Sequence, residues 1–247
     1  MTTEIETYLN SLSEDISIID ISSKNIDYIP DLTRFKNLEK LYCHKNKLTS
    51  LPPLPQNIVE LSCCDNKLTS LPTLPEQLKE LFCFNNQLTS LPPLPQNLEI
   101  LLCSKNQLTS LPPLSQNLEI LNCSENQLTS LPPLPQNLEI LYCSENQLTS
   151  LPTLPTQSLL ELYYDNNPIY EIINNNRMIQ INKNIKILNN FRHLYYCLKF
   201  KKQLRNYWLW EKVREPIVME KYHPNYLLEN LGDEDDLDAV LYNWIHK

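Results

Sequence analysis

Apolar residues recur along residues 38–154 in a pattern that repeats every twenty residues. One copy has leucine at Leu98, Leu101, Leu108, Leu111 and Leu114, and the other copies carry leucine or isoleucine at the equivalent positions. The phrase Asn-(Gln or Lys)-Leu-Thr-Ser-Leu-Pro closes consecutive copies, for example at residues 146–152. Such a period is typical of a solenoid, in which each copy forms one turn and its apolar residues join a shared core.

Each turn is predicted to hold one short strand that pairs with the next turn in a parallel sheet, with neighbours about 4.8 Å apart. The Leu-Pro-Pro-Leu-Pro segments, such as residues 51–55, are expected on the opposite side as an extended, polyproline-like back, because proline has a fixed φ and no amide hydrogen. Longer, irregular copies extend the array in both directions. Eight strands are therefore predicted, from near Ile19 to near Tyr164.

Helices are expected on both sides of the array. Thr3 and Glu6 form a capping-box pattern that precedes apolar residues at helical spacing: Ile5, Tyr8, Leu9 and Leu12. Beyond the array, a helical apolar stripe comprises Ile187, Leu188, Phe191, Leu194, Tyr195 and Leu198. The predicted fold is α+β, with a capping helix in residues 1–18, a solenoid in 19–172 whose parallel sheet forms the concave face, and a helical region in 173–247.

Two further columns of the repeat carry polar or sulfur side chains. Asparagine recurs at Asn46, Asn66, Asn86, Asn106, Asn126 and Asn146, where a buried amide can bond the backbone groups of the turn. Cysteine recurs at Cys43, Cys63, Cys83, Cys103, Cys123 and Cys143. Stacked cysteines about 4.8 Å apart do not match the Cβ separation of about 3.8 Å in a disulfide, so reduced thiols that fill the core are expected.

These repeats resemble the short leucine-rich repeat of secreted bacterial effectors, whose motif is Leu-Pro-x-Leu-Pro-x-x-Leu-x-x-Leu-x-(Val or Leu)-x-x-Asn-x-Leu. The resemblance covers about residues 19–172 and implies the leucine-rich repeat fold. It implies no particular activity, because such arrays serve unrelated functions. The chain has cysteine where the family has valine, and this feature resembles repeat proteins of giant double-stranded DNA viruses. The C-terminal segments at residues 210–216, 222–224 and 236–238 resemble the same proteins.

Composition and charge narrow the function classes. The single glycine, Gly232, excludes Gly-rich phosphate loops. The start of the chain resembles no signal peptide and no apolar run has membrane-spanning length, so a cytoplasmic protein without membrane contact is expected. Residues 1–169 hold nine basic and nineteen acidic side chains, whereas residues 177–214 hold ten basic and one acidic. The array should therefore repel nucleic acid.

The residues that flank each inward leucine vary between copies and are predicted to point out of the concave face. The candidate binding residues for a protein partner are Tyr42, Phe82, Phe84, Ile100, Leu102, Ile120, Asn122, Ile140 and Tyr142. A contiguous apolar patch with aromatic residues is typical of a protein-contact site. The predicted function is thus a non-enzymatic interaction module or scaffold, with a host protein as one possible partner and an undetermined oligomeric state.

Other interpretations stay open at this point. The C-terminal helices could cover the patch, or the duplicated isoleucines could have no role. The basic and aromatic segment around residues 195–210 could bind single-stranded nucleic acid, although no nucleic-acid fold signature accompanies it. The array could also be an adaptor that presents substrates to a ubiquitin ligase.

No cofactor, metal site or catalytic group is predicted. Some effector relatives carry a ubiquitin-ligase domain with a cysteine followed two residues later by aspartate, but Cys197 is followed by Leu198 and Lys199 and the tail is short for that domain. His44 and Cys64 occupy neighbouring copies of one column, yet two surface ligands seldom make a metal site.

Overall fold

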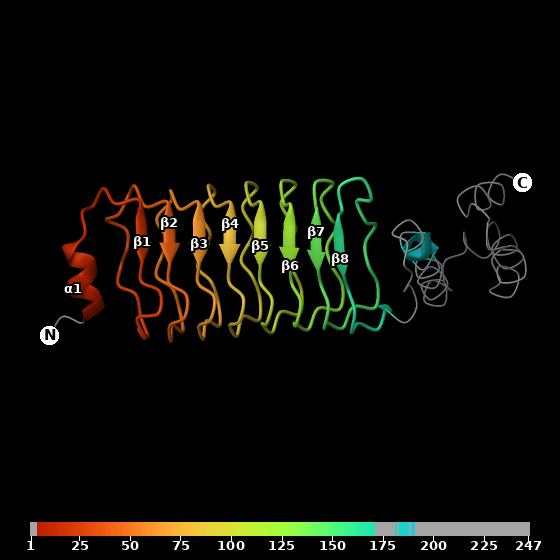
Figure 1. Cartoon of the computed structure of the whole chain (residues 1–247), viewed down its shortest axis with the longest axis horizontal. Helices are drawn as coiled ribbons and strands as arrows, with labels where there is room; N and C mark the ends of the chain where they lie inside the picture. Colours follow the sequence, from red (N-terminus) through yellow and green to blue (C-terminus); the bar gives the residue numbers. More distant parts are fainter. Residues whose placement is uncertain (1–3, 171–180, 182, 188, 191–247) are drawn as a thin grey trace, which may run out of the picture. The chain divides into compact units, whose positions relative to one another are not determined.

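The computed structural model describes residues 4–170, 181, 183–187 and 189–190. One helix, α1 (Glu4–Ser11), precedes eight parallel strands that follow one another in sequence order across a single sheet (Figure 1). The strands are β1 (Ile18–Asp20), β2 (Lys40–Tyr42), β3 (Glu60–Ser62), β4 (Glu80–Phe82), β5 (Ile100–Leu102), β6 (Ile120–Asn122), β7 (Ile140–Tyr142) and β8 (Glu161–Tyr163). The predicted number, direction and span of the strands are confirmed.

The core consists of the leucine columns that the periodicity predicted. The central leucine of each strand pairs with the same residue of the next turn, as Leu101 does with Leu121, and both are fully buried. The cysteine column is buried behind the strands and contains free thiols. On the opposite side, residues 51–55 and their equivalents contain neither helix nor strand, as their prolines predicted.

Asparagine side chains tie each turn to the previous one. The Asn106 amide donates to the carbonyls of Cys83, Cys103 and Ser104 at 3.1 Å each, and its Oδ1 accepts from the Leu88 N–H at 3.0 Å. The same set of bonds recurs at the buried Asn86, Asn126 and Asn146. The predicted structural role of this column is confirmed.

The residue before each of these asparagines has a left-handed backbone, although none is glycine. The φ angle is 55° at Lys45 and also at Lys105, and similar values recur at the equivalent positions of the other turns. A left-handed backbone is unfavourable for residues with a Cβ atom, so the asparagine bonds must outweigh a local penalty in every turn.

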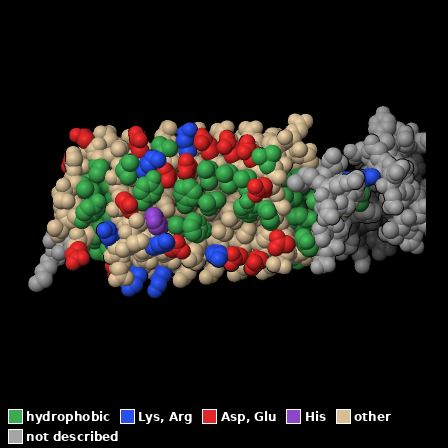
Figure 2. Space-filling view, in the orientation of Figure 1, with side chains coloured by type: hydrophobic (Ala, Val, Ile, Leu, Met, Phe, Trp, Pro, Cys, Tyr) green, Lys and Arg blue, Asp and Glu red, His purple; other side chains and the backbone are tan. Residues whose placement is uncertain are grey.

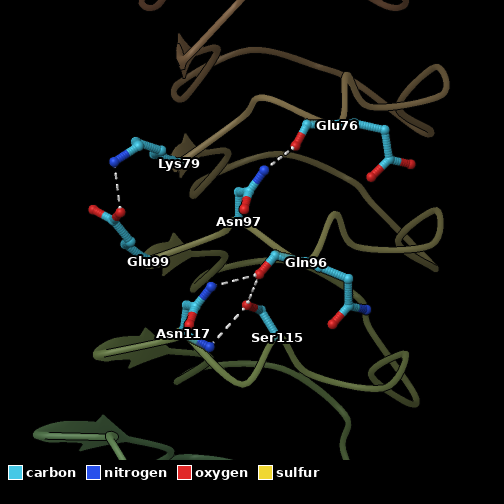
Figure 3. A network of polar contacts seen from close by, with 7 residues as sticks. All are labelled: Glu76, Lys79, Gln96, Asn97, Glu99, Ser115 and Asn117. Carbon is cyan, nitrogen blue, oxygen red and sulfur yellow. Dashed lines mark hydrogen bonds and ion pairs between the residues drawn. The ribbon is translucent and has the colours of Figure 1, made fainter.

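A second polar ladder lies where the chain enters several of the strands, β5 and β6 among them (Figure 3). Asn97 donates to the Glu76 carbonyl at 3.0 Å, and Asn117 donates to the Gln96 carbonyl at 3.1 Å. Ser115 replaces the proline of other copies and is fully buried, but its hydroxyl donates to the Gln96 carbonyl at 2.6 Å and accepts from the Asn117 N–H at 3.1 Å. The irregular residue is therefore accommodated without loss of polar contacts.

Helix α1 covers the N-terminal end of the core, as expected. It buries Ile5 and Leu9, and the Leu9 carbonyl accepts a hydrogen bond from the Arg34 guanidinium, which also lies 4.5 Å from the Phe35 ring centroid. Tyr8 was predicted on the same apolar stripe but is 41% exposed. Ile5 and Leu9, one turn apart, are therefore the residues of the predicted stripe that the helix buries.

The chain is helical again at the described residues 181, 183–187 and 189–190, where Ile181 and Ile185 are buried. Thr3 of the predicted capping box and most of the predicted C-terminal stripe lie outside the described residues. The basic segment within 191–214 and the helices predicted after it also lie outside the described residues. Nucleic-acid binding by that segment and the three-part domain division therefore stay predictions.

Candidate protein-interaction face

The predicted binding residues lie on one side of the sheet, which we call the outer sheet face and define by the two positions that flank the central leucine of each strand. Pairing in register aligns Ile100, Ile120 and Ile140 in one row. It aligns Phe82, Leu102, Asn122 and Tyr142 in a second row. All of these side chains are half-buried, as is Phe84 just beyond β4. The structure thus brings most of the predicted set together over β4–β7.

Tyr42 is set apart from that group. One strand, β3, separates it from Phe82, and Ser62 of that strand is buried. The Ser62 hydroxyl lies 3.3 Å from His44 Nδ1 and 3.7 Å from Cys64 Sγ. Small side chains on this part of the face are shielded by larger neighbours in adjacent turns.

Cys64 occupies an outward position of the repeat but, contrary to the expected surface location, is only 6% exposed. Its column neighbours, His44 and Phe84, have much larger side chains, and neighbouring turns are about 4.8 Å apart. Burial also raises the pKa of the Cys64 thiol. Within the described residues, no group of three His, Cys, Asp or Glu side chains is arranged to hold a metal ion.

The outer sheet face extends one strand further than the predicted residues. Tyr163 of β8 is 55% exposed, and its ring packs edge-on against Tyr142 with a centroid separation of 5.0 Å. Leu160, just before β8, is 74% exposed. Sequence reasoning missed both, because the last repeat is one residue longer and they do not fall in the twenty-residue register.

The N-terminal half of the face carries charges that largely compensate each other. Lys40 and Glu60 form an ion pair at 2.8 Å, and this hydrogen bond raises the Lys40 pKa. Burial and the neighbouring Glu60 raise the pKa of the Glu80 carboxyl. Residues 38–97 hold five basic and five acidic side chains, so this half has no net charge.

The C-terminal half is strongly acidic at the borders of the apolar rows. Residues 98–169 hold seven acidic side chains and one basic residue, Lys105. On one border are Glu99, Glu119 and Glu139, which directly precede the three isoleucines; on the other are Glu125, Glu145 and Asp165. Figure 2 shows hydrophobic side chains along the middle of this face with acidic side chains above and below them. These borders were not predicted from the apolar pattern of the repeats.

Some of the acidic side chains already have a partner in the chain. Glu99 pairs with Lys79 at 2.8 Å, and Glu125 pairs with Lys105 at 3.4 Å (Figure 3 shows the first pair). Asp165 accepts a hydrogen bond from Ser144 at 2.6 Å, and Glu161 accepts one from Tyr142, which raises the Tyr142 pKa. Among the described residues, Glu119, Glu139 and Glu145 have no ion-pair partner.

The cysteine column offers no reactive thiol in the folded state. Burial raises the pKa of Cys83 and of Cys123 to about 12, and it raises the pKa of Cys43, Cys63, Cys103 and Cys143 as well. The thiolate is the nucleophilic and metal-binding form of cysteine. These side chains therefore act as small apolar residues of the core, as predicted.

The fold and the outer sheet face define a solenoid repeat protein whose variable side chains are collected on one surface. A family model described as Leucine Rich repeats (2 copies) matches residues 96–136 and 116–156. The solved structure of a Shigella effector LRR domain is 30% identical with a TM-score of 0.56, and the alignment covers 66% of this chain and 73% of that one. The chain belongs to the leucine-rich repeat family, which confirms the predicted fold class.

Two YopM structures are also similar. YopM from Yersinia enterocolitica WA-314 is 34% identical with a TM-score of 0.55, covering 64% of this chain and 39% of that one. The leucine-rich effector protein YopM from Yersinia pestis is 33% identical with a TM-score of 0.51, covering 61% and 49%. The chain thus spans less than half of either YopM chain.

The comparison with curated proteins gave no match. The matching family model describes repeats and no catalytic domain. No helix among the described residues is long and apolar enough to cross a bilayer. The resemblance to giant-virus proteins stays a prediction.

Proposed function

We propose that the chain is a non-enzymatic protein-binding module that docks a protein partner on the outer sheet face over β4–β7, with Tyr163 and Leu160 at the border of the contact. The row of Ile100, Ile120 and Ile140 carries this proposal. Strands β2 to β4 have Lys40, Glu60 and Glu80 at the same position, so the solenoid does not need an apolar residue there. The likeness to leucine-rich effector proteins supports a binding role and makes a host protein the first partner to seek.

An alternative physical reason for the isoleucines is stability alone. Stacked β-branched side chains favour strands and shield one another from water. Stability and binding make different predictions when a single isoleucine is replaced. A residue needed only for stability should lower the melting temperature when it is lost, whereas a contact residue should lower the affinity for the partner.

Ile120→Glu is the decisive variant because it installs the residue that β3 and β4 carry at this position. Gln116→Glu is the matched control: it adds the same charge at an exposed site in the turn before β6. A photo-crosslinking amino acid at position 120 in cells would identify the contacting protein, and the same group at position 116 would report background. The purified partner is then titrated against the wild type and both variants by calorimetry.

We expect Ile120→Glu to weaken binding at least tenfold, or about 1.4 kcal/mol, while Gln116→Glu leaves the affinity unchanged. The melting temperatures of the variants should lie within about 3 °C of the wild type, because the substitution is at a half-buried site that tolerates glutamate in other turns. Equal affinity of the partner for Ile120→Glu and the wild type would refute the proposed face.

A further inference from the structure

We infer that the occupant of this face is a cationic amphipathic helix, with apolar side chains along the centre of its contact surface and lysine or arginine on both sides. This inference rests on the proposed docking face and adds the chemistry of its partner. It follows from the charge at the borders of the apolar rows and from the spacing of the turns.

The charge is concentrated where the apolar rows lie. The seven acidic side chains and one lysine of residues 98–169 border the isoleucines of β5–β7, whereas the half with Lys40 and Glu60 is balanced. Acidic side chains stand on both borders, so a partner with cations on only one side would leave one border unmatched. Complementary charges accelerate association and fix the orientation of a partner.

Ion pairs within the chain leave part of this charge uncompensated. Glu99 and Glu125 are paired with Lys79 and Lys105. Glu119 and Glu139 on one border and Glu145 on the other have no ion pair with any residue that the structure describes. All three are exposed, so a docked cation can reach them without displacing an internal partner. They are the side chains that should select for lysine or arginine.

The spacing of the turns favours a helix over an extended segment that runs across the strands. Neighbouring turns repeat at about 4.8 Å, so the isoleucines of β5 and β7 are about 9.6 Å apart. Residues i and i+7 of a helix are about 10.5 Å apart, with i+3 or i+4 near the middle. In an extended segment, residues on one face recur at about 6.7 Å and lose register with the turns. An i, i+3, i+7 apolar stripe can therefore place one side chain on each isoleucine.

The test uses two designed 18-residue peptides with the same leucine stripe at i, i+3 and i+7 positions, one flanked by lysine and the other by glutamate. Each carries a fluorophore, and binding to the full chain is measured by anisotropy at 0.15 M salt. We expect the lysine peptide to bind at least tenfold more tightly than the glutamate peptide. The Ile120→Glu variant should bind the lysine peptide no better than it binds a scrambled peptide of the same charge.

Two triple variants separate local recognition from attraction by net charge. The first replaces Glu119, Glu139 and Glu145 with glutamine. The matched control replaces three exposed acids outside this half of the face, Glu14, Glu39 and Glu76, and changes the net charge equally. We expect the first variant to weaken binding of the lysine peptide at least tenfold and the control to change it less than twofold.

Equal weakening by both triple variants, or equal binding of both peptides, overturns the inference of a cationic partner but leaves the docking face in place. The inference of a cationic partner is also overturned, with the docking face kept, if neither peptide binds while the crosslinked partner does. A crosslinked partner whose contact surface is anionic would have the same consequence. A dimer in sedimentation that Ile120→Glu abolishes would make a second copy the occupant and overturn the inference.

Discussion

The asparagine ladder gives the most quantitative prediction for the fold, and Asn106→Ala is its test. The substitution removes three donated bonds and one accepted bond. The carbonyls keep other donors: Asn86 for Cys83, Asn126 for Cys103 and the Asn85 N–H for Ser104. The Leu88 N–H has no such substitute, because Asn106 Oδ1 is its acceptor in the structure.

One orphaned buried donor costs about 1–3 kcal/mol, and the lost bonds to carbonyls that keep another partner add a smaller amount. We therefore expect Asn106→Ala to lower the free energy of unfolding by about 2–4 kcal/mol. For a chain of this size, the melting temperature should fall by about 5–15 °C. Urea and thermal unfolding of the full chain, followed by circular dichroism, measure both quantities.

Gln107→Ala is the matched control, because the neighbouring Gln107 side chain is exposed. It should change stability by less than about 0.5 kcal/mol. If Asn106→Ala also costs less than about 1 kcal/mol, the N–H of Leu88 has found water or another acceptor. The ladder would then not be what holds the left-handed turns together.

Three further predictions concern other parts of the fold. Lys45→Gly should raise stability by about 0.5–1 kcal/mol, because φ is 55° at this residue, whereas Lys47→Gly at an exposed site of ordinary φ should lower it; urea unfolding compares the two. Burial raises the pKa of the Cys123 thiol to about 12, whereas the same thiol in the unfolded chain has a pKa near 9. The thiol therefore loses its proton in the unfolded chain first, and the stability of the fold decreases as the pH rises above about 9. Cys123→Val should reduce the slope of unfolding free energy between pH 9 and 10.5 by about 1 kcal/mol per pH unit on average, and an unchanged slope would contradict burial of this thiol. Arg34→Ala removes the bond to the Leu9 carbonyl and should increase hydrogen exchange in α1 more than in β6; equal protection of α1 in both proteins would exclude that contact.

Much of the fold was predictable from the sequence because each turn places the same residue types at the same positions. Leucines such as Leu101 and Leu121 fill equivalent positions, and the asparagine and cysteine columns follow them. Each twenty-residue turn buries its leucine and cysteine columns in the same way. The strands were therefore located to within about one residue at both ends of the array.

The surface was less predictable because exposure depends on neighbouring turns. Ser62 and Cys64 occupy outward positions but lie among larger side chains and are buried. Tyr163 was missed because an added residue shifts the last repeat. Glu119 and Glu145 occupy different positions of the repeat, so the sequence does not show that they border one surface. The structure places them on opposite sides of the same apolar row.

Titration of the protein that crosslinks at position 120 against Ile120→Glu and Gln116→Glu decides whether the partner docks on the outer sheet face. We expect at least tenfold weaker binding to Ile120→Glu alone, while the melting temperatures of the wild type and both variants agree within about 3 °C. Undiminished binding to Ile120→Glu would show that the partner does not use this surface.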